Sequence, residues 1–167
     1  MKFGIVIFLA FSLSIFGCTS SKQTGTGELG VKVSSDSTIV ENPVAISFEQ
    51  TACYGTCPIH KMIIYKDGTS FYAAERHTKI TGAFTYNFSS TEIEEILNKA
   101  KGLKFFEAEK EYTSPITDLP TTIIYMQYGS KKHKVTAYTN YPENIQLLIE
   151  YLYDVTQTTK WVKAEIK

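Results

Sequence analysis

Apolar and polar residues alternate in several stretches of the chain, and this period of two predicts half-buried β-strands. In the first stretch, Val44, Ile46 and Phe48 fall on the face that is expected to be buried. Short turns such as 66–68 and 129–130 separate neighbouring stretches and predict antiparallel hairpins. The predicted strands are residues 44–49, 59–65, 69–76, 84–88, 121–128 and 131–138.

Two further segments repeat their apolar residues at the helical spacing i, i+3, i+4, i+7. The first follows Ser89, which offers helix N-cap chemistry, and ends near Gly102; the second opens at Pro142. Their apolar faces are Ile93, Ile96, Leu97 and Ala100, and Ile145, Leu148, Ile149, Leu152 and Val155. The order β-β-β-β-α-β-β-α predicts an α+β fold, an antiparallel sheet of five to six strands with both helices packed on one face.

The beginning of the chain carries an apolar run, residues 3–16, that follows Lys2 and is broken only by Gly4, Ser12 and Ser14. It is shorter than the roughly 20 residues that span a bilayer, so it predicts a cleaved signal peptide. Residues 15–18, Ile-Phe-Gly-Cys, resemble the bacterial lipobox. The resemblance implies cleavage before Cys18 and acylation of Cys18, which makes the lipid bilayer the first expected partner. The alternative is an ordinary secretory signal with a coincidental Cys.

This interpretation divides the chain into four parts. A lipoprotein signal peptide covers residues 1–17, and a tether rich in Ser and Thr covers residues 18–42. A segment so poor in apolar residues cannot offset its ordering entropy, so the tether is expected to be flexible. A single globular domain is expected over residues 43–161, and a C-terminal tail over residues 162–167.

Two short features of the tether bear on location. Residues 36–38, Asp-Ser-Thr, resemble the acceptor of Bacteroidetes O-glycosylation, which implies a candidate modification at Ser37. Residues 22–23 are not followed by an acidic pair, so the surface-export signal of some such lipoproteins is missing. We therefore expect a bacterial cell-envelope protein, lipid-anchored in the outer membrane and facing the periplasm.

The composition excludes one class of function, and the absence of several catalytic and binding motifs excludes others. The sequence has 17 basic and 17 acidic side chains, so it lacks the basic excess of a nucleic-acid-binding protein. It contains no Gly-x-Ser-x-Gly elbow, no phosphate-binding Gly loop and no His-Glu-x-x-His pattern, and His60, His77 and His133 are scattered. We expect no catalytic residues, no cofactor and no resident metal.

The cysteines leave several interpretations open. With Cys18 lipidated, Cys53 and Cys57 remain as an even pair, which outside the cytoplasm favours a disulfide that fixes a turn. A redox role is the first alternative, although thiol oxidoreductases usually place Cys-x-x-Cys at the start of a helix. A metal site that adds His60 and a pair of free thiols are the others.

Two other features are candidates for ligand contact or for structure. Arg76 is the only arginine, and a guanidinium suits a bidentate carboxylate partner better than an ammonium does. Residues 117–122, Thr-Asp-Leu-Pro-Thr-Thr, are typical of a loop that enters a strand, because Asp118 can cap its own turn. Thr117, Thr121 and Thr122 belong to this motif, and Asp118 with Arg76 is a candidate buried pair.

Residues 53–58, Cys-Tyr-Gly-Thr-Cys-Pro, and residues 117–122 together resemble two motifs of a family of bacterial secreted and lipid-anchored proteins. The domain of that family has no assigned function. The resemblance spans residues 44–153 and implies no catalytic residue and no substrate. It does imply that Tyr54 and the Thr-Asp-x-Pro-Thr-Thr residues are shared features of one small domain.

These observations predict a noncatalytic binding or interaction domain at the periplasmic face of the membrane. Its partner is expected to be an envelope protein or a small ligand, bound on the free face of an aromatic-rich sheet. The alternative is a thiol–disulfide redox or chaperone-like protein that uses Cys53 and Cys57. A metal or small-ligand carrier that uses His60 with the Cys pair is a third hypothesis.

Overall fold

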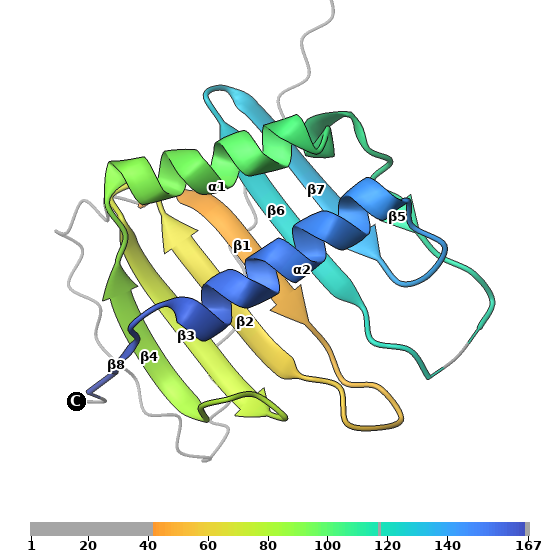
Figure 1. Ribbon diagram of the computed structural model, residues 1–167, viewed down its shortest axis with the longest axis horizontal. Helices are drawn as coiled ribbons and strands as arrows, with labels where there is room; N and C mark the ends of the chain where they lie inside the picture. Colours follow the sequence, from red (N-terminus) through yellow and green to blue (C-terminus); the bar gives the residue numbers. More distant parts are fainter. Residues whose placement is uncertain (1–41, 117, 166–167) are drawn as a thin grey trace, which may run out of the picture. The chain divides into compact units, whose positions relative to one another are not determined.

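The computed structural model describes residues 42–116 and 118–165, whose strands form one sheet (Figure 1). The strands lie across it in the order β5-β7-β6-β1-β2-β3-β4-β8. Neighbouring strands are antiparallel except β5 and β7, which are parallel. The strands are β1 (Val44–Gln50), β2 (Ile59–Tyr65), β3 (Thr69–Arg76), β4 (Gly82–Asn87), β5 (Glu111–Tyr112), β6 (Thr122–Tyr128), β7 (Lys131–Ala137) and β8 (Val162–Lys163).

Two helices, α1 (Ser90–Gly102) and α2 (Glu143–Thr158), cover the same face of this sheet (Figure 1). A capping box starts α1, because the Glu92 N–H donates to the Ser89 hydroxyl and the Ser89 N–H donates back to the Glu92 carboxylate. A short 3-10 helix, η1 (Phe105–Glu107), follows α1. Within the part of the chain that the structure describes, no helix is long and apolar enough to cross a membrane.

The hydrophobic core lies between the two helices and the sheet. The apolar residues predicted on the helix faces are buried in it, except Val155, which is half-buried. The largest fully buried side chains are Ile46, Phe48, Met62, Ile64, Tyr72, Phe105, Ile124, Met126, Val135, Ile145, Leu148 and Leu152. Both helices therefore bury their apolar faces against the same side of the sheet.

The α+β class and the two helices are confirmed, but the sheet has eight strands rather than five or six. The additional strands are β5, which lies outside the predicted strands and helices, and β8, which lies in the expected tail. Each contains 2 residues. A pair of residues is too short to show alternation, so hydrophobic periodicity could not reveal either strand.

The start of β1 differs from the predicted alternation. Val44 pairs with Tyr65 and Ile46 with Ile64, so the register shifts between these two pairs. Because a shift by one residue exchanges the two faces of a strand, Ala45 is buried with the core while Val44 lies on the opposite face. The expectation that Val44 shares the buried face of Ile46 and Phe48 is therefore wrong.

Two turn glycines, Gly68 between β2 and β3 and Gly129 between β6 and β7, give a testable comparison. Gly68 has φ +91°, and a Cβ there would overlap the carbonyl oxygen of Phe88, whose N–H donates to the Gly68 carbonyl at 2.8 Å. Gly129, in the β6–β7 turn, has φ +59° and open space around its missing Cβ. We expect Gly68→Ala to lower the free energy of unfolding by ~2 kcal/mol or more, and Gly129→Ala by ~1 kcal/mol.

Urea denaturation of both variants and of the wild type measures this difference. The matched control is Gly129→Ala, which carries the backbone strain without the overlap. Equal losses in the two variants would contradict the assigned contact between Gly68 and the Phe88 carbonyl.

Candidate functional site

Two loops that are distant in the sequence meet at one end of the sheet. The loop between β1 and β2 is closed by a disulfide between Cys53 and Cys57, whose Cα atoms are 5.8 Å apart. The N–H of Tyr54 in this loop donates to the carbonyl of Asp118 in the β5–β6 loop at 3.2 Å. Nearby, the N–H of Thr51 donates to the carbonyl of Thr121 at 3.0 Å. The structure thus brings together the two motifs found in the sequence.

The region where the disulfide loop and the β5–β6 loop meet is here called the loop end, and its residues differ in exposure. Tyr54 is 91% exposed, Ile116 53% and Leu119 41%, so apolar groups face solvent from both loops. Thr121 is half-buried and its N–H donates to the Thr51 hydroxyl at 3.0 Å. Thr122 is buried. The threonines therefore tie the loops to the sheet, whereas the apolar side chains of the loops are exposed to solvent.

Some predicted residues do not contribute to this loop end as expected. Arg76 ends β3 opposite Ile59, and its side chain is exposed. Asp118 is also exposed and adopts φ +77°. The expected buried pair of Arg76 and Asp118 is therefore wrong, because neither side chain is buried. The predicted sites at Cys18, Ser37 and Thr117 lie outside the described residues.

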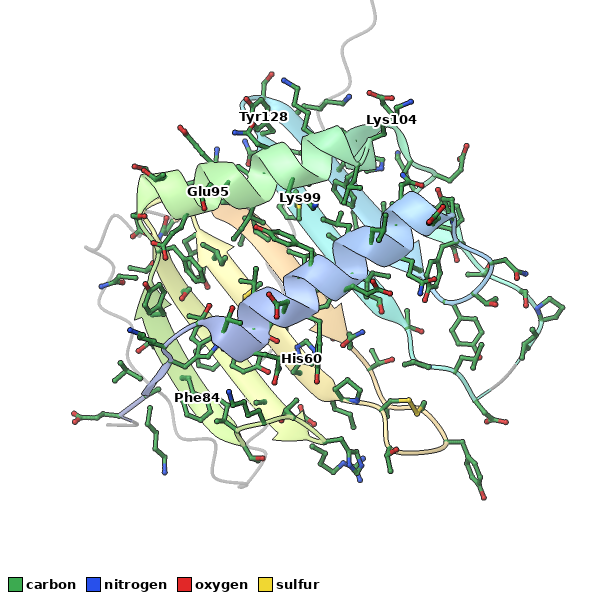
Figure 2. All side chains as sticks on the ribbon, in the orientation of Figure 1. His60, Phe84, Glu95, Lys99, Lys104 and Tyr128 are labelled. Atoms are coloured by element: carbon green, nitrogen blue, oxygen red, sulfur yellow. A yellow bond between two sulfur atoms is a disulfide. The ribbon has the colours of Figure 1, made fainter. Side chains whose placement is uncertain are left out.

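His60 lies in the core beneath α2 rather than beside the disulfide (Figure 2). Its side chain is 2% exposed, and the ring centroids of Phe48, Tyr72 and Tyr153 lie 5.2–5.7 Å from its own. His60 Nε2 hydrogen-bonds to Gln50 Oε1 at 2.9 Å, whereas Nδ1 has no hydrogen-bond partner. Burial lowers the pKa of His60 to about 4.

This environment separates His60 from the Cys pair that the metal hypothesis joined to it. The two sulfurs are bonded to each other, and the imidazole is packed among aromatic rings in the core. Over residues 42–116 and 118–165, no group of three or more His, Cys, Asp or Glu residues is placed to hold a metal ion. His60 belongs to the core, where its ring fills space and holds Gln50.

A pH dependence of stability follows from the buried His60. The folded chain keeps the ring neutral down to about pH 4, whereas the unfolded chain protonates it below its ordinary pKa of 6.5. Because the unfolded state binds more protons in this window, stability falls as pH is lowered. We expect a loss of ~2 kcal/mol between pH 8 and pH 5, measured by urea denaturation, and a much flatter dependence in His60→Gln. An equal slope in the variant would assign the dependence to another group.

The face of the sheet that the helices leave uncovered, here called the open face, presents a continuous row of side chains. Each of these residues alternates along its strand with a core residue, such as Phe48 in β1 and Met62 in β2. Cross-strand pairing aligns them across the sheet. The row consists of Lys134 (β7), Tyr125 (β6), Ser47 (β1), Ile63 (β2), Phe71 (β3) and Thr85 (β4).

The centre of this row is concave. Ser47 lies between Tyr125 and Ile63 in the row, and its small side chain leaves room above β1. An open hollow of about 590 Å³ lies there, here called the central hollow. It is lined by Pro43, Val44, Ser47, Glu49, Lys61, Ile63, Ile123, Tyr125, Gln127, Lys132 and Lys134. Its lining combines aliphatic side chains and one aromatic ring with several charged groups.

Charge is unevenly distributed around the central hollow. On β1 and β2, Lys61 Nζ lies 2.9 Å from Glu49 Oε2, so these two charges are paired. On β7, Lys132 and Lys134 line both the central hollow and a second hollow of about 250 Å³, which Lys110 also lines. We call Lys110, Lys132 and Lys134 the basic rim. Sequence reasoning expected a free face but named none of these residues, although alternation along 131–138 already placed Lys132 and Lys134 together.

These features define a small α+β domain with one face covered by helices and one face open, and with two loops joined at one end. The chain belongs to the family described as a domain of unknown function (DUF6438), whose model matches residues 44–156. This confirms that the chain resembles a family with no assigned function over nearly the whole domain. No curated protein matches the chain.

Proposed function

We propose that this protein is a noncatalytic binding domain, held at a bacterial membrane by lipid on Cys18, that engages a partner through the open face of its sheet. The observation that carries the proposal is the central hollow on the face of the sheet that α1 and α2 leave uncovered. An antiparallel sheet commonly leaves one face to water, and that face is then usually polar. Here Ile63, Ile123 and Tyr125, which are half-buried, line the hollow among charged side chains, and apolar groups gathered in a concavity are typical of binding surfaces.

The N-terminal segments support the membrane part of the proposal. The sequence predicts a tether over residues 18–42, and a random coil of that length reaches roughly 25–30 Å. That reach lifts a small domain off the lipid surface and lets it turn toward a partner. We place the protein in the outer membrane, facing the periplasm, on the strength of the lipobox and the missing acidic pair.

The disulfide is better explained by structure than by redox work. Cys53 and Cys57 lie in a loop between two strands, not at the start of a helix whose dipole would lower a thiol pKa. The loop they close presents Tyr54, whose N–H donates to the Asp118 carbonyl of the β5–β6 loop. We assign the pair to holding this loop end in shape.

Lipidation at Cys18 is testable by metabolic labelling with an alkyne fatty acid in a bacterial host. We expect the wild type to carry the label and to sediment with membranes, and Cys18→Ser to lose both properties, because the thiol is the acyl acceptor. A double variant, Cys53→Ser with Cys57→Ser, is the matched control and should keep the label. Labelling of Cys18→Ser would overturn the anchor.

Use of the open face is testable by site-specific photocrosslinking in living cells. A benzophenone amino acid replaces Tyr125 in the central hollow or, as a matched control, Leu147, which is exposed on α2. We expect defined adducts from position 125 and few from position 147, because the partner meets only the open face. Adducts of equal yield at both positions, or none at position 125, would overturn the proposal.

A further inference from the structure

We infer that the open face binds an extended acidic peptide, whose carboxylates meet the basic rim and whose apolar side chains lie in the central hollow. This inference rests on the proposed function and names its ligand class. Among the described residues, the strongest combination of charge, concavity and apolar surface lies along the row from Lys134 to Phe71.

The chemistry changes in order along this row. It begins with the ammonium of Lys134, passes the ring of Tyr125 and the small Ser47, and ends at Ile63 and Phe71. Phe71 is 38% exposed, so the apolar end faces solvent. A ligand matched to this order carries negative charge at one end and apolar groups at the other.

The charges at the β7 end are in excess. The basic rim contributes three lysines, and pairing of β5 with β7 places Glu111 opposite Thr136 on the same face. Glu111 offsets one of these charges, and Glu49 is occupied by Lys61. A net positive potential therefore remains beside Tyr125, and it favours carboxylates over a neutral or cationic ligand.

The dimensions fit a short stretch of extended chain. Neighbouring strands lie about 4.8 Å apart, so the four intervals from Lys134 to Phe71 span about 19 Å. An extended peptide rises about 3.3 Å per residue, so about six residues cover the row. The central hollow is open, and aliphatic and charged side chains are mixed in its lining, which suits the alternating side chains of a peptide better than it suits an enclosed alkyl chain or stacked sugar rings.

The test uses the purified full-length mature lipoprotein in nonionic detergent and fluorescence anisotropy of defined peptides. The probe is a blocked peptide of about six residues with glutamates at one end and alternating leucine and serine after them. We expect saturable binding that weakens with added salt, because the rim charges are exposed. A peptide with lysine in place of glutamate, and one with serine in place of leucine, should each bind at least about tenfold more weakly.

Variants of the open face test the basic rim and the central hollow separately. The charge-reversed double variant, Lys132→Glu with Lys134→Glu, and the filled variant, Ser47→Leu, should each weaken binding about tenfold or more. The matched control is Lys99→Glu with Lys104→Glu, an equal charge change on α1 and just beyond its end (Figure 2), which should leave binding unchanged. Thermal melts confirm that each variant is folded, and a second filled variant, Ser47→Val, replaces Ser47→Leu if the latter unfolds.

Several results would overturn the inference. They are equal binding of the lysine peptide, insensitivity to both the charge reversal and the filled hollow, and binding of anionic vesicles or a sulfated polysaccharide without binding of the peptide. If the peptide fails while position 125 still gives adducts in cells, the ligand class is wrong and the proposed function stands. If position 125 gives no adducts, the proposed function itself fails.

Discussion

The packing of both helices against one face of a single sheet is the constraint on which the other features of this domain depend. An amphipathic helix must bury its apolar stripe, and α1 and α2 do so against the same alternate positions of the central strands. Those positions must stay apolar and tightly packed, so they have little freedom to serve a ligand. The opposite positions carry no such demand. They therefore hold the mixture of Lys, Ser, Tyr and Ile that forms the open face.

Strand β1 joins the two halves of the fold. In the sheet, β2, β3, β4 and β8 lie to one side of it and β6, β7 and β5 to the other, and β1 pairs with both β2 and β6. The same strand supplies Phe48 to the core and Ser47 to the floor of the central hollow. Just beyond its end, Thr51 ties the disulfide loop to the β5–β6 loop. Core, open face and loop end are therefore fixed by one register, and a slip of one residue would exchange Ser47 with Phe48.

The sequence predicted what local spacing encodes and missed what long-range pairing creates. Alternation and helical spacing located six strands and two helices, because each spans enough residues to show its period. The bulge that turns Val44 outward, and the joining of β8 to β4, depend on partners elsewhere in the chain. The meeting of Tyr54 with Asp118 is of the same kind. The burial of His60 was not predicted, because one polar residue on a strand does not indicate the aromatic rings that surround it.

Net charge illustrates why composition alone is a poor guide to the open face. The full sequence sums to zero, which excludes a long-range attraction to polyanions. At physiological salt, however, charges act mainly within about 8 Å of one another. Lys132 and Lys134 lie two residues apart on one face of β7, at a spacing of about 7 Å, so they act together on a bound group. Glu95 is exposed on α1 (Figure 2), which covers the opposite face of the sheet, so its carboxylate does not lie beside them. The potential that a ligand meets is therefore set by the strand pairing that assembles the rim, and this pairing is invisible in the sum of charges.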